Sequence, residues 1–141
     1  MKCLDLKQEH TQAIEKLATA RQELETAKES VKTAKIEIEK ARTQLQTEEQ
    51  KLQTTQARWK SCEDDNTVEK MFELTIGRNS VSAAQQGVAI ALRGLGIAQE
   101  GFATAQKGVT TAQTFADALY CELVQTATAS PAKKCIHRLH Y

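Results

Sequence analysis

Apolar residues that recur every seven positions dominate this sequence. In the first half of the chain, large apolar side chains alternate with alanines in two interleaved series. The first series is Leu17, Leu24, Val31, Ile38, Leu45, Leu52 and Trp59, and the second is Ala13, Ala20, Ala27, Ala34 and Ala41. The other positions carry mostly Glu, Lys, Arg, Gln and Thr. A narrow apolar stripe with this period predicts a helix of a coiled coil.

The second half of the chain repeats the pattern. Its first series is Leu74, Val81, Val88, Leu95, Phe102, Val109 and Ala116, and its second series is Gly77, Ala84, Ala91, Ala98, Ala105, Ala112 and Leu119. Large side chains dominate the first series and small ones the second. Between the two halves, residues 61–67 are mostly turn and cap formers, and Asn66 with Glu69 can form a capping box. We therefore expect the chain to reverse direction there.

The two halves match when the chain is folded back on itself. In an antiparallel coiled coil with the turn at this place, facing positions add up to about 129. Each layer then pairs one large side chain with one small side chain, which is how helical cores interdigitate. The pairs are Leu45 with Ala84, Ile38 with Ala91, Val31 with Ala98, Leu24 with Ala105, Leu17 with Ala112, Ala41 with Val88, Ala34 with Leu95, Ala27 with Phe102 and Ala20 with Val109.

The predicted fold is therefore all-α, a long antiparallel helical hairpin built as an alanine-rich coiled coil. We expect the first helix within residues 1–62, the turn at 63–67 and the second helix at 68–128. A break in the second helix is possible at residues 77–80, and a flexible tail is expected at 129–141. Trp59 is expected to pack with Val68, Met71 and Phe72 in a small core beside the turn.

Glycines of the second helix also recur every seven residues, at 87, 94, 101 and 108. Each costs about 1 kcal/mol relative to alanine inside a helix, so their regularity indicates a surface that another backbone approaches closely. We predict an interface made of Gly87, Ala91, Gly94, Ala98, Gly101, Ala105, Gly108, Ala112, Ile90, Ile97 and Leu92.

The second helix carries few charges, because residues 79–116 include only Arg93, Glu100 and Lys107. A single neighbouring helix cannot cover its remaining faces. We therefore expect the hairpins to associate into a helical bundle, most simply a dimer of hairpins, or to bind a helical protein partner.

Charge and motifs exclude several classes of function. Nineteen basic residues against eighteen acidic ones indicate no nucleic-acid partner. Phosphate-binding loops, Ser-His-Asp arrangements and His-Glu-x-x-His motifs are missing from the sequence, so we expect no enzyme and no cofactor. The polar N-terminus lacks the apolar segment of a signal peptide, which makes the cytoplasm the default location.

Cysteine and histidine residues near the C-terminus are the candidates for a metal site. Cys121, Cys135, His137 and His140 are possible Zn²⁺ ligands, but the expected outcome is a tail in which they do not converge, and so no metal. Reduced thiols are the default. A disulfide that joins Cys135 to Cys121 or to Cys3 is the alternative, because a direct bond between Cys3 and Cys121 would require the helix ends to fray.

Together these features predict a non-enzymatic structural or protein-interaction module. The alternative is a membrane-active protein, an elongated bundle of the kind seen in helical pore-forming toxins, in which residues 81–102 enter lipid. Arg93 opposes that alternative, because a central arginine costs roughly 2.5 to 3.5 kcal/mol on insertion scales.

Overall fold

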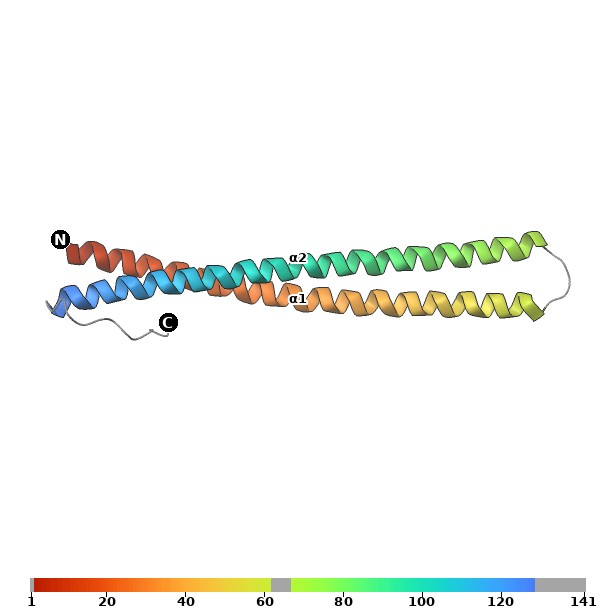
Figure 1. Cartoon of the computed structure of the whole chain (residues 1–141), viewed down its shortest axis with the longest axis horizontal. Helices are drawn as coiled ribbons and strands as arrows, with labels where there is room; N and C mark the ends of the chain where they lie inside the picture. Colours follow the sequence, from red (N-terminus) through yellow and green to blue (C-terminus); the bar gives the residue numbers. More distant parts are fainter. Residues whose placement is uncertain (1, 62–66, 129–141) are drawn as a thin grey trace. The chain divides into compact units, whose positions relative to one another are not determined.

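The computed structural model describes residues 2–61 and 67–128, which form two helices, α1 (Lys2–Ser61) and α2 (Thr67–Thr128) (Figure 1). The two helices pack against each other as an antiparallel hairpin, and the described residues contain no strand. The predicted all-α hairpin is therefore confirmed. α2 continues through residues 77–80 without a break. The predicted turn, apart from Thr67, and the predicted tail lie outside the described residues.

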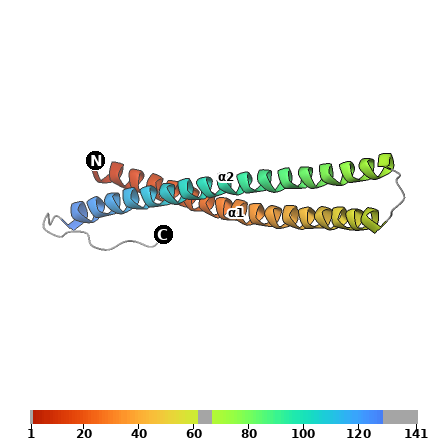
Figure 2. The same cartoon turned by 45° about the vertical axis from the view of Figure 1, so that its right-hand side comes forward.

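Contacts divide the chain into two units, which are described separately. The first unit combines Met1–Glu29 with Gln99–Tyr141, and the second unit is Ser30–Ala98. Within each unit, the α1 and α2 segments lie side by side and run in opposite directions (Figures 1 and 2). Each unit thus contains its own stretch of the seam between the helices.

In the first unit, the seam contains the most completely buried residues. Ala13 and Ala116, which the sequence pattern places opposite each other, are both buried, and Leu119 packs with them. Leu17 is the largest fully buried side chain. Polar side chains connect the helices beside this core, where Arg21 donates a hydrogen bond of 2.9 Å from Nη2 to Oε1 of Gln113.

In the second unit, the packing of one glycine fixes the register. A Cβ built on Gly77 would lie 2.9 Å from Cδ1 of Leu52, so the leucine side chain fills the space that this glycine leaves. The sequence pattern places these two residues opposite each other. Ile38 and Ala84 are buried in the same seam. The predicted register is therefore confirmed at the Leu52 layer.

Most of the seam is only half-buried. Among the side chains that the structure describes, the buried apolar ones are Ala13, Leu17, Ile38, Ala84, Ala116 and Leu119. The intervening seam positions, such as Leu24 and Val31 on α1 and Leu95 and Phe102 on α2, are half-buried. Two helices alone cannot enclose a seam in which every layer has one small side chain, so the hairpin has a thin core.

The polar surface of α1 stabilises the helix only modestly. Some of its acidic residues are followed three positions later by basic ones, as in the ion pairs of Glu25 with Lys28 at 2.9 Å and Glu39 with Arg42 at 3.4 Å. Such exposed pairs contribute about 0.3 to 0.5 kcal/mol each. The hairpin therefore depends mainly on the seam.

The prediction of an apolar core beside the turn is wrong. Trp59 is half-buried, but its partner is polar, because Nε1 donates a 2.9 Å hydrogen bond to Oε2 of Glu73. The guanidinium of Arg58 pairs with the same carboxylate and lies 5.3 Å from the centre of the tryptophan ring. The side chains of the expected core on α2, which are Val68, Met71 and Phe72, are all exposed. They lie at helix positions outside the seam, where α1 does not reach them.

Candidate functional site

The residues predicted as an interface on α2 separate into two sets. Ala91, Ala98, Ala105 and Ala112 are half-buried at seam positions, where the register sets them opposite large side chains of α1. The glycines at 87, 94, 101 and 108 lie beside the seam, and a Cβ built on any of them would have no neighbouring atom within 4 Å. The α1 helix therefore does not occupy the space that these glycines leave.

Two isoleucines lie on the same side of α2 as the glycines. Ile90 and Ile97 follow Gly87 and Gly94 by three residues, a spacing that puts side chains on one helix face. They are 65% and 67% exposed. Ser80 and Ala83 continue this surface toward the start of α2. We call the surface formed by Ser80, Ala83, Gly87, Ile90, Gly94 and Ile97 the Gly/Ile face, and all six residues belong to the second unit.

Three other predicted interface residues lie outside this face. Leu92 is exposed, but it follows Ile90 by two residues and therefore points about 200° away around the helix. Gly101 and Gly108 belong to the first unit, where both are exposed. Phe115, seven residues after Gly108, is also exposed in that unit.

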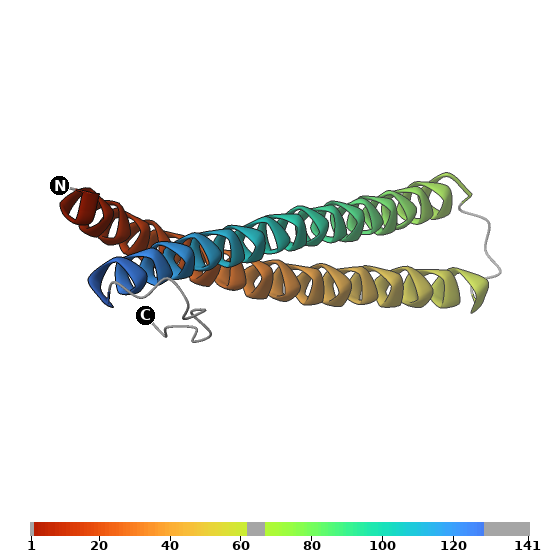
Figure 3. The same cartoon turned by 60° about the vertical axis from the view of Figure 1, so that its left-hand side comes forward.

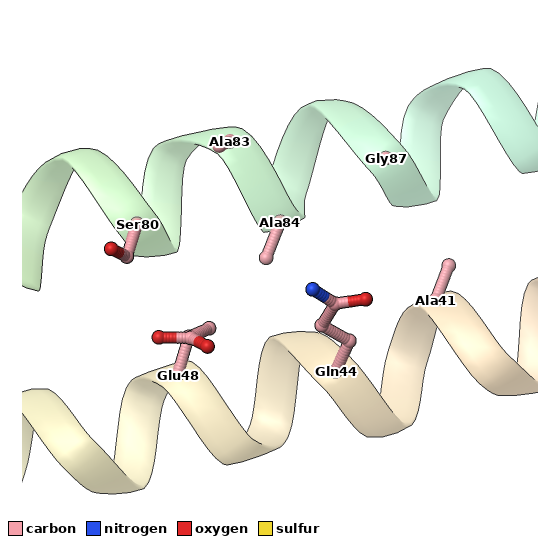
Figure 4. A pocket seen from close by; sticks show the side chains of 7 residues that line it. All are labelled: Ala41, Gln44, Glu48, Ser80, Ala83, Ala84 and Gly87. Atoms are coloured by element: carbon pink, nitrogen blue, oxygen red, sulfur yellow. The ribbon is translucent and has the colours of Figure 1, made fainter.

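A hollow of about 290 Å³ lies between the Gly/Ile face and α1 (Figure 4). Its lining consists of Ala41, Gln44, Glu48, Ser80, Ala83, Ala84 and Gly87, all of which belong to the second unit. The contribution of α2 is limited to small side chains, which is why space remains. Figure 4 shows the side chains of Gln44 and Glu48 pointing toward α2.

Glu48 is an unusual residue for its position. It stands seven residues after Ala41, where the alanine series of the seam would continue, and its side chain is only 20% exposed. Lys51 pairs with it at 3.4 Å from Nζ to Oε1. The sequence contained a signal for this feature, since a carboxylate at a seam position breaks the apolar pattern.

The candidate metal ligands do not form a described site. Cys121 is disulfide-bonded, so the expectation of reduced thiols is wrong for this residue, and its sulfur is not free to bind a metal. The ring centre of His10 lies 5.9 Å from that of Tyr120. No group of three potential metal ligands occurs within the described ranges 2–61 and 67–128. Cys135, His137 and His140 lie outside them.

Two further depressions lie along α1, at residues 35–48 and 19–26, and each is lined by that helix alone. Within the part of the chain that the structure describes, neither helix has a stretch long and apolar enough to cross a membrane. No protein-family model, curated protein or solved structure matches the chain.

Proposed function

We propose that this chain is a non-enzymatic structural or protein-interaction module that presents the Gly/Ile face of α2 to another helix. One observation carries the proposal: Ile90 and Ile97 are about two-thirds exposed beside two glycines whose open side meets no atom of the chain. Two glycines inside a helix cost about 2 kcal/mol relative to alanine. The exposed isoleucines also lack the favourable free energy that burial of their side chains would contribute. A second helix that packs closely on this face accounts for both.

The spacing of the face favours a helical partner. Gly87 and Gly94 are seven residues apart, and so are Ile90 and Ile97. This is the period of the seam between α1 and α2, and a helix lying along α2 meets residues with that period over its whole length. Small residues at such positions let two helix backbones approach closely.

The thin core of the hairpin supports the same proposal. Seam residues of the second unit such as Val31, Val88 and Leu95 are only half-buried by the α1–α2 contact. A helix added beside α2 would cover more of these side chains, as in a four-helix bundle. Association would therefore stabilise the hairpin as well as serve its function.

A membrane-active role, in which residues 81–102 enter lipid, is the alternative. The exposure of Ile90 and Ile97 favours it. Arg93 opposes it. The regular glycines do not separate the two roles, because ridges of small residues also pack helices together within membranes. Flotation of the protein with liposomes tests this alternative, because recovery of the chain with the vesicles would contradict a module that acts only in solution.

Photo-crosslinking in cells that express the chain tests the proposal without assuming which protein binds. The photoreactive residue p-benzoylphenylalanine replaces Ile97 on the Gly/Ile face or, as the control, Ile36, which is 55% exposed on α1. We expect light to produce a defined protein adduct from position 97 and none from position 36. An absence of adducts at position 97, or equal adducts at both positions, would contradict the proposal.

A further inference from the structure

We infer that the helix that covers the Gly/Ile face is α2 of a second copy of this chain, running antiparallel to the first. This inference rests on the proposed function and identifies its partner. Both halves of a complementary contact lie on this one face: the projecting side chains of Ile90 and Ile97, and the hollow beside Ser80, Ala83 and Gly87. A surface that carries both projection and hollow can pair with itself.

An antiparallel pairing matches these features layer by layer. When Gly87 of one copy faces Ile90 of the other, Ser80 faces Ile97 and Ala83 faces Gly94. The two-fold axis then passes between residues 88 and 89, and every contact occurs twice, as in an isologous dimer. The isoleucines of each copy come to lie over the Ser80 and Gly87 ends of the partner's hollow. This is the large-with-small rule that already governs the seam between α1 and α2.

Other arrangements of the two helices are worse. A parallel pairing in register sets isoleucine against isoleucine and glycine against glycine, which leaves steric crowding at one layer and a void at the next. Sliding the antiparallel pair by one heptad in one direction brings the two Arg93 side chains together at the axis. Sliding it in the other direction sets Ile97 against Glu73. Both alternatives place a charge unfavourably, which selects the first register.

Charge does not oppose the chosen pairing. On α2, residues 79–98 include one charged side chain, Arg93, and in this register it lies near the neutral Gln86 of the second copy. α1 contributes polar side chains at the edge, where Gln44 lines the hollow and Glu37, seven residues earlier, pairs with Lys40 at 3.3 Å. An apolar centre with a polar rim is the usual composition of a protein interface.

Sedimentation of the purified full-length chain over a range of concentrations gives the first test. We expect a monomer–dimer equilibrium. Gly87→Leu should raise the dimer Kd at least about tenfold, because a bulky side chain is then forced against Ile90 twice in each dimer. Gly96→Leu is the matched control, since it also replaces an open-sided glycine of the second unit but follows Gly94 by two residues and so points about 200° away from the Gly/Ile face, and it should leave Kd unchanged. Circular dichroism verifies that both variants are helical.

Cross-linking of the purified chain tests the direction and register. Trypsin cuts after Arg78, Arg93 and Lys107, so p-benzoylphenylalanine at position 97 lies in the peptide 94–107. The antiparallel pairing predicts a link to the peptide 79–93 that fragmentation of the linked peptides places at or next to Ser80. Residues 90–93 of this peptide lie within about 11 Å of position 97 on the same helix, so a link to them can form within one chain. Ser80 is about 25 Å away along α2, so a link to it forms only between chains. A link from position 97 to a second copy of the peptide 94–107 would overturn the antiparallel register.

The outcomes separate this inference from the proposed function. If the chain stays monomeric at all concentrations while position 97 still forms adducts with another protein in cells, the partner is not a second copy. The proposal that the Gly/Ile face docks a helix is then retained. Dimers whose links from position 97 never reach Ser80 or its immediate neighbours overturn the inference. If Gly87→Leu has the same dimer Kd as the unchanged chain, and position 97 forms no adducts in cells, both the second-copy inference and the proposed function are overturned.

Discussion

Cδ1 of Leu52 occupies the space in which a side chain on Gly77 would begin, because a Cβ built on that glycine would lie only 2.9 Å from it. Ordinary contacts of a Cβ are longer, so any side chain at residue 77 would make this methyl group of Leu52 move. The same contact fixes how α1 and α2 are aligned in the second unit. It also distinguishes Gly77 from the glycines of the Gly/Ile face, where a built Cβ would meet no atom of the described residues within 4 Å.

Gly77→Ala and Gly108→Ala should therefore have different effects on stability. At residue 108 the open surroundings leave only the gain in helix propensity, about 1 kcal/mol, which should raise Tm by about 4 °C. At residue 77 the new methyl group must displace the Cδ1 methyl of Leu52, so the rise in Tm should be smaller than at residue 108. Thermal unfolding followed by circular dichroism measures both. An equal rise in Tm for the two variants would show that Leu52 moves aside without cost and that this layer is not closely packed.

Enlarging a buried seam alanine should destabilise the hairpin. Ala116 is fully buried in the first unit, where it packs with Ala13 and Leu119, so Ala116→Leu should overpack that layer and lower the free energy of unfolding by about 1 to 3 kcal/mol. Ala89→Leu makes the same chemical change at an exposed position and should alter it by less than about 0.5 kcal/mol. Urea denaturation provides the comparison. Equal losses would place Ala116 outside the buried core.

Truncating Leu17 should be the more damaging of two matched changes on α1. Its side chain is fully buried in the first unit, and Leu17→Ala should lower the free energy of unfolding by about 2 to 5 kcal/mol. Leu4→Ala removes the same atoms from an exposed site and should have little effect. The urea concentrations at the midpoint of unfolding are compared for the two variants. Similar midpoints would contradict the burial of Leu17 in the core.

Neutralising Glu48 should strengthen association. Its carboxylate lines the hollow that the second copy covers, and covering it removes water from a charge that only one exposed lysine balances in the ion pair with Lys51. Glu48→Gln should therefore lower the dimer Kd in sedimentation experiments. Glu39→Gln is the control, because Glu39 also pairs with a basic residue three positions later but does not line this hollow. A weaker dimer with Glu48→Gln would show that the hollow stays open.

Much of the fold could be predicted because one physical rule repeats along the chain. A seven-residue period identifies the residues that face the other helix, and matching large with small side chains then sets the register, as Leu52 with Gly77 illustrates. The period depends on neighbouring positions of one helix and the match depends on pairs of positions, so both can be recognised in the amino-acid sequence. The seam positions of Ile38 and Ala84 follow in the same way.

Residues outside the seam could not be placed so well. Val68, Met71 and Phe72 are apolar, yet apolar character alone does not say whether a neighbour exists to cover them, and α1 offers Trp59 a carboxylate partner from Glu73 instead. The disulfide of Cys121 was likewise one of several pairings that the spacing allowed.

The docking face was only partly foreseen. The periodic glycines indicated a close approach of some helix, but whether α1 supplied it depended on where α1 lies around α2. The open space beside Gly87 and Gly94 shows that α1 does not lie against these glycines. Leu92 is also exposed, but it points to another side of α2 and does not belong to the same surface. In the side view of Figure 3, α1 and α2 of the second unit run alongside each other, and the Gly/Ile face belongs to the part of α2 within that unit.

Hydroxyl-radical footprinting of the purified chain tests most directly whether the Gly/Ile face is covered in solution. In an isolated hairpin, Ile90 and Ile97 are 65% and 67% exposed and should be oxidised at least as fast as Ile36, which is 55% exposed. Coverage by a second copy predicts the reverse order at high protein concentration, with protection of Ile90 and Ile97 lost on dilution. Oxidation of both isoleucines at least as fast as Ile36 at every concentration would contradict the account.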